Sequence, residues 1–433
     1  GVLPFAPASA YGEPDALKAL VDAAHARGLM ILLDVVYNHF GPEGNHLGAY
    51  AHDFFRDDVA TPWGRAIDFR REPVRELFIG NALYWIDEYR FDGLRLDAVH
   101  AIAPNDWLAE LARRVRDAAG SDRHVHLVLE NDANSATLLE RGFDAQWNDD
   151  FHHAAHVLLT GEREGYYADY AAEPAVELAR CLAEGFAWQG RASPHRDGAL
   201  RGEPSAHLPP TAFVAFLQNH DQIGNRAFGD RLDALVAPEA LHAARALLLL
   251  SPQIPLLFMG EEWGARTPFR FFADFSGSLA DAVREGRRRE FRAFAAFADE
   301  AARARIPDPN DEATFRDSLP DFDPARQDDA DAFARMRNLI AVRNAHVVPR
   351  LGGAHALDAN AIGACAVVAR WRLGDGTVLA LFANLASAPV AVDAPVGELI
   401  YETQAGDANA LRAGLLGAHA LVALLAGAGS DDR

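Results

Sequence analysis

Residues 93–100, GLRLDAVH, combine the apolar pattern of a buried β-strand with two charged side chains that are two positions apart. Side chains in a strand alternate between its two faces, so Arg95 and Asp97 are expected on one face and the leucines on the other. A charge that faces a dry core is costly unless it is paired. We therefore expect this strand to end at a site that uses a paired arginine and aspartate.

Strand and helix patterns alternate along the first two-thirds of the chain. Short apolar runs predict buried strands, whereas longer amphipathic segments predict helices. Repeated strand–helix units are typical of a parallel sheet. The helices are predicted at 13–28, 72–89, 105–119 and 238–250, and the strands at 29–36, 91–99, 124–131, 143–149, 211–221 and 255–263.

Polar residues end most of the predicted strands, as at 34–39, 95–100, 219–221 and 261–262. In a closed (β/α)8 barrel, functional groups gather at the carboxyl ends of the strands. A doubly wound sheet is the alternative, but it concentrates its site at one switch point. Because the polar ends recur along the whole series, we favour an α/β fold with a TIM-type barrel over residues 1–345.

The tail changes character from about residue 350. A turn signal at 374–376 separates two β-type runs and predicts a hairpin, and further β-type runs follow at 388–393, 397–403 and 419–425. We expect a small C-terminal β-sandwich over 350–427. The stretches 186–210 and 306–331 are expected to be loops.

Composition excludes several classes of partner. The chain has 62 acidic and 41 basic residues, a net charge of −21, which disfavours nucleic acid and anionic membranes and suits a neutral substrate. Its two cysteines lie far apart and form no disulfide framework, which favours a reducing compartment. Neither a long apolar span nor a signal peptide is apparent, although the chain begins at Gly1 and not at methionine.

Three carboxylates stand at three predicted strand ends: Asp97, Glu130 and Asp221. A retaining glycosidase needs two carboxyl groups about 5–5.5 Å apart, one an ionised nucleophile and the other a protonated acid. Neighbouring barrel strands can supply that spacing. Arg95 would keep Asp97 ionised, and burial near negative charge would keep the acid protonated.

Four segments resemble, in order, the motifs of the α-amylase family of glycoside hydrolases: DVVYNH (34–39), GLRLDAVH (93–100), LVLE (127–130) and FLQNHD (216–221). A closer resemblance is to the maltooligosyltrehalose trehalohydrolases, through stretches such as LENDANS (129–135) and GEPSAHLPP (202–210). It implies a cytoplasmic retaining hydrolase that cleaves the α-1,4 bond next to a terminal trehalose unit and needs no organic cofactor.

The resemblance also implies roles for individual residues. Asp97 would be the nucleophile, Glu130 the general acid/base and Asp221 the third carboxylate, which stabilises the transition state. Positions that surround or support the substrate are Arg95, His39, His220, Asp34, Asn219, Gln222 and Trp263. The substrate would be maltooligosyltrehalose or a related α-glucan.

The family's barrel begins earlier than this chain. The stretch 1–11 resembles the loop after the second barrel strand, so we expect strands three to eight here. The first two strands and the family's N-terminal β domain would then be absent. Open parallel edges are normally avoided, which puts the activity of such a barrel in question.

Other interpretations remain open at this stage. The chain could be an α-glucan branching enzyme or an amylase of the same superfamily, or a glucan-binding protein without activity. Arg95 and Asp97 could form a structural ion pair, and Asp221 could cap a helix. His39 and His220 could be ordinary hydrogen-bonded histidines.

No metal site is expected. Residues His152, His153 and His156 form a cluster, but no second group of ligands has metal spacing, and we interpret them as helix-surface residues. Asn38 and His100 fall where some amylases hold calcium, but no acidic loop completes a cage.

Overall fold

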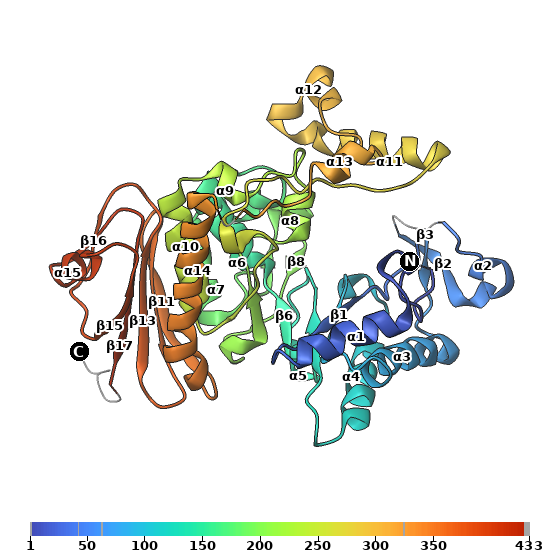
Figure 1. Cartoon of the computed structure of the whole chain (residues 1–433), viewed down its shortest axis with the longest axis horizontal. Helices are drawn as coiled ribbons and strands as arrows, with labels where there is room; N and C mark the ends of the chain where they lie inside the picture. The colour runs from blue at the N-terminus through green and yellow to red at the C-terminus, as the bar shows by residue number, and fades with distance from the viewer. Residues whose placement is uncertain (1, 42, 62–63, 324, 428–433) are drawn as a thin grey trace. The chain divides into compact units, whose positions relative to one another are not determined.

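The computed structural model describes residues 2–41, 43–61, 64–323 and 325–427, and the chain divides into two units, residues 1–147 and 148–433 (Figure 1). Each unit has parallel strands of its own. Among the residues described, no helix is at once long enough and apolar enough for a bilayer crossing.

The described part of the first unit contains four parallel strands, and their order in the sheet is the same as their order along the chain. Helices connect them, as parallel pairing requires, which confirms the predicted strand–helix alternation. The helices begin and end close to the predicted residues, whereas the strands are shorter than the apolar runs. The elements are β1 (Leu32–Val35), β4 (Gly93–Leu96), β5 (His126–Leu129) and β6 (Ala145–Trp147), with α1 (Pro14–His25), α3 (Glu72–Asp87), α4 (Asp106–Ala119) and α5 (Ala136–Glu140).

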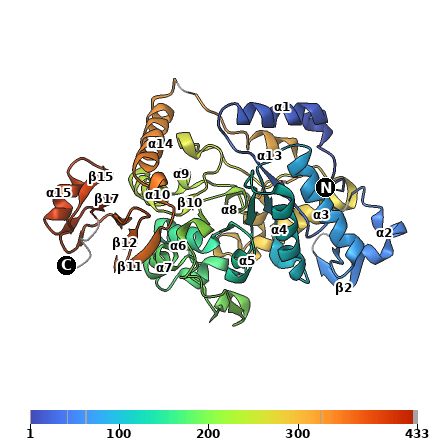
Figure 2. The same ribbon diagram turned by 90° about the horizontal axis from the view of Figure 1, so that it is seen from below.

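An aromatic cluster fixes α3 and α4 against the connection from β1. The two helices lie side by side (Figure 2). Trp107 of α4 is fully buried, and its ring centroid lies 4.2 Å from that of Phe69 and 6.3 Å from that of Phe78 on α3. The connection itself contains α2 (Leu47–Tyr50) and the antiparallel pair β2 (Phe55–Thr61) and β3 (Gly64–Ile67).

Strand β1 differs from the expectation of burial on both faces. Leu32 is 40% exposed and Met30, just before the strand, is 64% exposed. The reason is position: β4 is the strand with which β1 pairs among the described residues, so β1 is an edge. An apolar run alone does not distinguish a central strand from an edge.

The described part of the second unit contains one parallel pair, β9 (Phe213–Ala215) and β10 (Ile254–Pro255), and a larger set of helices. The stretch 186–210, expected to be a loop, contains the short antiparallel pair β7 (Arg191–Ala192) and β8 (Leu200–Arg201), and the stretch 306–331 is partly helical. The helices are α6 (Asp149–Thr160), α7 (Pro174–Glu184), α8 (His220–Gly224), α9 (Leu232–Leu235), α10 (Pro238–Leu250), α11 (Gly277–Glu290), α12 (Glu300–Ala304), α13 (Glu312–Arg316) and α14 (Gln327–His346).

The C-terminal segment forms an antiparallel sheet, as its sequence predicts. The order is β11 (His355–Gly363), β12 (Ala366–Arg372), β13 (Val378–Asn384), β17 (Ala420–Ala426) and β15 (Glu398–Glu402). The predicted hairpin joins β12 to β13, and Gly376 in its turn has φ +84°, where a side chain would be strained. A two-stranded sheet, β14 (Val390–Ala391) with β16 (Leu415–Leu416), and α15 (Asp407–Arg412) complete it.

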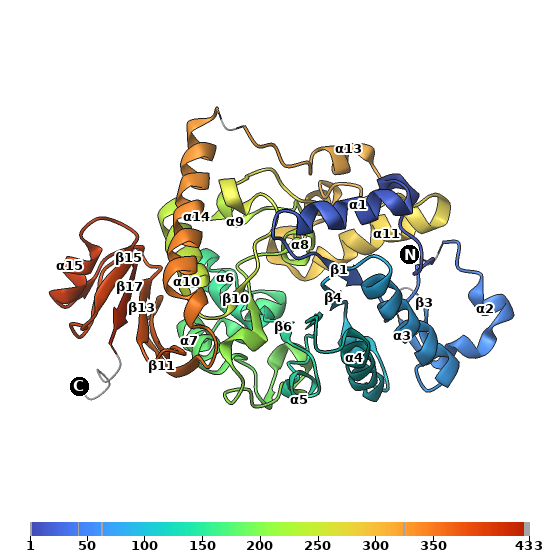
Figure 3. The same ribbon diagram turned by 60° about the horizontal axis from the view of Figure 1, so that its bottom comes forward.

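The two faces of this sheet have different partners. On one face α7, α10 and α14 share a continuous apolar cluster with the sheet, and α10 and α14 lie beside it (Figure 3). On the other face Phe382 and Leu424 pack with Leu411 of α15 and Leu416 of β16. The sheet is therefore part of the packing of the second unit.

A buried arginine fastens α14 to the end of α10. Arg343 is 7% exposed and donates to the carbonyl oxygens of Leu249 at 2.8 Å, Ser251 at 2.6 Å and Gln253 at 2.9 Å. These carbonyls follow or end a helix and have no helical partner of their own. Burial lowers the pKa of Arg343 to about 10, which leaves it charged at neutral pH.

Replacement of this arginine tests its role. Arg343→Met should lower the free energy of unfolding by about 3 kcal/mol, because three buried carbonyls lose their donor. Urea denaturation measures the change. Arg337→Met, on the exposed side of the same helix, is the matched control and should stay within about 0.5 kcal/mol of the parent. Equal effects of the two replacements would contradict this role.

Candidate active site

Arg95 of β4 is the centre of a charge cluster in the first unit. Its Nη1 lies 2.7 Å from Oδ1 of Asp34 and 2.8 Å from Oδ1 of Asp97, and its Nη2 lies 3.3 Å from Oε2 of Glu130. The strand register explains the meeting, because Asp34 is paired with Arg95 and the Glu130 N–H donates to the carbonyl of Leu96. One guanidinium therefore contacts three carboxylates from three consecutive strands.

The surroundings keep Arg95 charged. It is 6% exposed, and burial by itself lowers its pKa, but the carboxylates of Asp34, Glu130 and Asp97 outweigh burial and raise the pKa overall. The indole of Trp147 on β6 covers it, with 4.3 Å between the guanidinium carbon and the ring centroid. Trp147 was not predicted as a site residue, since a single tryptophan in a short strand carries no motif.

The backbone turns sharply after Asp97. Strand β4 ends at Leu96, and Ala98 adopts the left-handed region at φ 42° and ψ 48°. That conformation is uncommon for a residue other than glycine and is found where the surrounding structure enforces it. Here the Ala98 N–H donates to Oε2 of Glu130 at 2.5 Å, and the Val99 N–H donates to the carbonyl oxygen of Glu130 at 3.0 Å.

Asn38 also orients Asp97. It is 7% exposed, and its Nδ2 donates to Oδ2 of Asp97 and to the Asp97 carbonyl oxygen, each at 3.0 Å. Its own Oδ1 contacts Nδ1 of His39. Burial lowers the pKa of His39, although Asp97 acts in the opposite direction. Asn38 is not among the predicted site residues and is named in the sequence analysis only for a calcium site. Its place inside DVVYNH was the signal that could have identified it as a site residue.

Four predicted site residues belong to α8 of the second unit or to its cap. Asn219 caps the helix by accepting from the Gln222 N–H at 2.9 Å, so the cap is Asn219 and not Asp221. Asp221 is partly exposed, and its Oδ2 lies 3.5 Å from Nε2 of His220. Gln222 donates to Oδ1 of Asp149 at 3.2 Å.

Trp263 lies at the wall of a cavity of about 720 Å³ in the second unit, between α10, α14 and the turn Glu261–Trp263. Its indole N–H donates to the Asp321 carbonyl oxygen at 3.2 Å, and its ring packs against Phe322. Glu261, on the same wall, is fully buried. Burial raises the pKa of Glu261 to about 7, although Arg245 and the Phe258 N–H oppose the shift.

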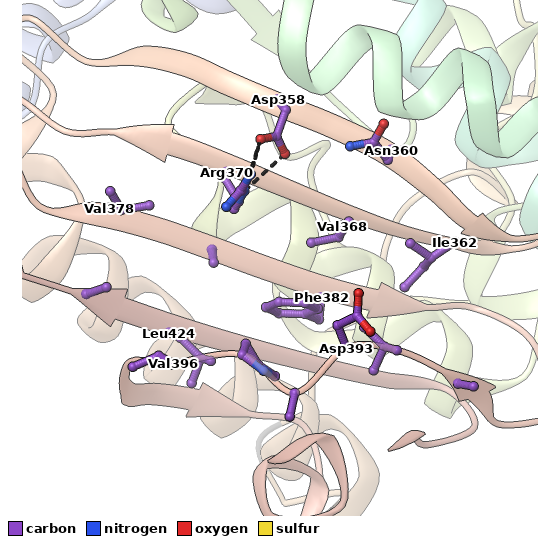
Figure 4. Close-up of a pocket in the computed structure, with 16 residues that line it drawn as sticks. Asp358, Asn360, Ile362, Val368, Arg370, Val378, Phe382, Asp393, Val396 and Leu424 are labelled. Carbon is purple, nitrogen blue, oxygen red and sulfur yellow. Dashed lines mark hydrogen bonds and ion pairs between the residues drawn. The ribbon is translucent and has the colours of Figure 1, made fainter. Parts of the chain in front are cut away.

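A larger cavity, about 1110 Å³, lies on the C-terminal sheet and its lining includes none of the predicted site residues (Figure 4). Arg370 and Asp358 form an ion pair at its wall, and Phe382 and Leu424 supply apolar surface. Its aromatic surface is mostly covered, since Phe382 is 5% exposed.

The histidine cluster on α6 is buried, which corrects the interpretation of these residues as surface groups. His152, His153 and His156 are each at most 8% exposed. The η4 turn, Gly165–Tyr170, covers them, so that His152 contacts the Tyr167 hydroxyl and the ring of His156 stacks on Tyr167 at 4.3 Å. In the described structure the cluster takes part in both packing and hydrogen bonding.

Several known proteins are similar to this chain in sequence and in structure. The chain is 44% identical over 323 residues to a malto-oligosyltrehalose trehalohydrolase of Deinococcus radiodurans, covering 72% of this chain and 52% of that protein. It is 39% identical over 424 residues to the protein of that name from Rhizobium sp., covering 93% and 68%. A crystal structure described as a candidate α-amylase from Salmonella typhimurium matches with a TM-score of 0.90 at 42% identity, covering 99% and 73%.

These matches show an α-amylase-like fold, with parallel strands and a C-terminal antiparallel sheet. A family profile described as a domain of unknown function (DUF3459) matches residues 354–423, which include most of that sheet together with α15. The chain spans about half the length of the Deinococcus protein that it matches.

The charge cluster around Arg95 generates a prediction about stability. Arg95→Met should lower the free energy of unfolding by about 3 kcal/mol, because three carboxylates lose the cation that they share; their partial exposure keeps the loss at the lower end for a broken buried pair. Thermal and urea denaturation measure it. Arg113→Met removes an exposed pair with Asp117 and should cost less than about 1 kcal/mol. A loss for Arg95→Met no larger than that of the control would show that the cluster is not held by Arg95.

Glu261 generates a prediction about pH. Between the ordinary glutamate pKa and about 7, the folded chain binds a proton that the unfolded chain releases, so this group's stabilisation is lost as the pH rises through the window. Glu261→Gln should therefore flatten the decline of unfolding free energy between about pH 5 and about pH 8, measured by urea denaturation. Glu262→Gln should leave the decline unchanged. A parent-like slope in Glu261→Gln would contradict the assignment.

Proposed function

Because this chain belongs to the malto-oligosyltrehalose trehalohydrolase family, we propose that it is a retaining glycoside hydrolase. Its substrate would be maltooligosyltrehalose, cleaved at the α-1,4 bond next to the terminal trehalose unit with release of trehalose. The observation that carries the proposal is that Asp97 and Glu130 both contact the guanidinium of Arg95. Contact with one guanidinium is compatible with the carboxyl separation of about 5–5.5 Å that a retaining mechanism requires.

The two carboxyl groups divide the chemistry between them. Glu130 donates its proton to the glycosidic oxygen while Asp97 attacks the anomeric carbon, so the C–O bond breaks as a covalent glycosyl-enzyme forms. Glu130, now a carboxylate, then takes a proton from water. The resulting hydroxide attacks the anomeric carbon and releases Asp97, which restores both groups.

Residues behind the nucleophile position it for attack. Arg95 donates from Nη1 to Oδ1 of Asp97, and Asp34 accepts from the same Nη1 and so helps to hold the guanidinium in place. Asn38 fixes the second carboxylate oxygen, so the attacking carboxylate has one bond on each oxygen. We assign Asn38 and Asp34 as positioning residues.

Other assignments follow the family motifs. Asp221 would bind sugar hydroxyls and stabilise the oxocarbenium-like transition state, and His39 and His220 would contact the same sugar. Asn219, Gln222 and Trp263 are proposed substrate contacts; in the second unit Asn219 also caps α8, so its amide has a structural use as well.

The finer architecture is part of the proposal. The parallel strands of the two units would be the third to eighth strands of a (β/α)8 barrel over residues 1–345, followed by a C-terminal β domain over 350–427. We also propose a cytoplasmic location, since Cys181 and Cys365 are both free thiols.

Product analysis tests the proposed activity directly. The chain is incubated with maltooligosyltrehalose of defined length, and the products are separated by chromatography. Free trehalose with a matching shorter maltooligosaccharide is expected. New α-1,6 branches would identify a branching enzyme, and linear products without trehalose an amylase. Binding in calorimetry without any product would identify a glucan-binding protein.

Two variants separate the roles of the carboxyl groups. Asp97→Asn and Glu130→Gln should each lower kcat by at least about 10³-fold, measured as trehalose release. A glycosyl fluoride substrate needs little acid assistance, so its first step should recover in Glu130→Gln and not in Asp97→Asn. The reverse pattern would exchange the two roles, and recovery in both would remove Asp97 as the nucleophile. Arg113→Met serves as the folded, active control.

A further inference from the structure

Two histidines and one aspartate meet at the amino ends of β5 and β6, away from the carboxylates described above. His124, His126 and Asp144 each offer a ligand atom, and these atoms lie within 4.8 Å of one another. Nε2 of His124 is 3.0 Å from Oδ1 of Asp144, and the two imidazole centroids are 4.6 Å apart. Glu130 follows the other end of β5, about 13 Å away along the strand.

Strand geometry explains the meeting. His124 and His126 are two positions apart, so their side chains share a face of the chain that enters β5. Asp144 immediately precedes β6, and its N–H donates to the Leu127 carbonyl oxygen at 2.9 Å. The spacing in the sequence gives no metal motif, since the aspartate is on the next strand. The parallel register therefore assembles a group that the sequence analysis did not expect.

The aspartate is held by groups that leave one oxygen available. Its Oδ2 accepts from Nη2 of Arg116 at 2.5 Å and from the Leu127 N–H at 2.7 Å. Its Oδ1 faces His124. Arg116 also donates to the carbonyl oxygens of Gly142 and Val125, which steadies the backbone on both sides of the group. Outer partners of this kind orient a metal-binding carboxylate.

The imidazole ring of His126 is uncommitted in the described structure. No described residue hydrogen-bonds to its ring, and its ring contact is with His124. In a simple His–Asp ion pair, His124 and Asp144 would suffice and His126 would contribute nothing. An uncommitted imidazole beside that pair is therefore the observation that favours a ligand.

We propose that His124, His126 and Asp144 form a binding site for a divalent transition metal of the Zn²⁺ class. Two imidazoles and a carboxylate are donors that Zn²⁺ accepts, with water in the fourth tetrahedral position. Metal–ligand bonds of about 2.0–2.1 Å place two tetrahedral ligand atoms roughly 3.3 Å apart. The three ligand atoms now lie within 4.8 Å of one another, so small side-chain rotations would bring them to that distance. Arg116 neutralises part of the carboxylate charge, so the affinity should be lower than that of thiolate sites.

Metal binding would join the starts of two neighbouring strands. The chain, treated with a chelator and dialysed, is titrated with Zn²⁺ in a calorimeter and with Co²⁺ under a visible-light spectrometer. One ion per chain is expected at this site, together with the Co²⁺ bands of a four- or five-coordinate ion. The thermal midpoint should rise with Zn²⁺, because the ion binds the folded chain.

His126→Ala is the decisive variant, since its ring carries no hydrogen bond whose loss would impair folding. It should weaken Zn²⁺ binding at least about tenfold and abolish both the Co²⁺ bands and the thermal shift. His100→Ala, which removes an exposed histidine that also lies beside an aspartate, should bind like the parent. Parent-like binding by His126→Ala, or no binding by the parent, would overturn the proposal. Zn²⁺ held by the carboxylates around Arg95 would give the first of these results.

Discussion

The buried guanidinium of Arg95 and its three carboxylate partners constrain the pairing of the strands that carry them. Arg95 cannot lie on β4 without anions close by, because an unpaired charge at 6% exposure is costly. The anions come from the neighbouring strands, so their register is constrained by electrostatics as well as by apolar packing. A shift of β1 by one residue would turn Asp34 to the other face and leave the cation short of a partner. Chemistry and strand pairing are therefore linked at one side chain.

The same geometry separates the two carboxyl groups proposed to react from the residues proposed to support them. Asp97 and Glu130 lie just beyond their strands, where the backbone is free to turn, whereas Arg95 is within a strand whose neighbours fix it on both sides. The left-handed conformation of Ala98 brings the two outer groups together, since its N–H reaches the Glu130 carboxylate. Functional side chains are often held in this way, with the supporting residue on a regular strand and a strained backbone conformation beside the groups whose geometry must be precise.

The sequence predicted much of the fold because its patterns are local. Helix α1 was expected at 13–28 and spans Pro14–His25, since its apolar period and the proline near its first turn are both readable. Strand β1 was expected to be buried on both faces and is partly exposed among the described residues, because burial depends on neighbours that no local pattern specifies. Trp147 was missed as a partner of Arg95 for the same reason, since its role exists only after the strands align, whereas the place of Asn38 inside DVVYNH offered a signal. The helix pattern of α6 does not reveal that its histidines are buried, because it does not show that η4, the next element in the chain, packs over them.

One nitrogen of Arg95 serves two carboxylates, since Asp34 and Asp97 both accept from Nη1. Two anions that share one donor are electrostatically linked, because neutralising one leaves the positive charge more fully to the other. In the proposed reaction, the covalent bond to the sugar removes the negative charge of Asp97. Asp34 would then keep Nη1 in place during the half of the cycle in which the nucleophile is esterified.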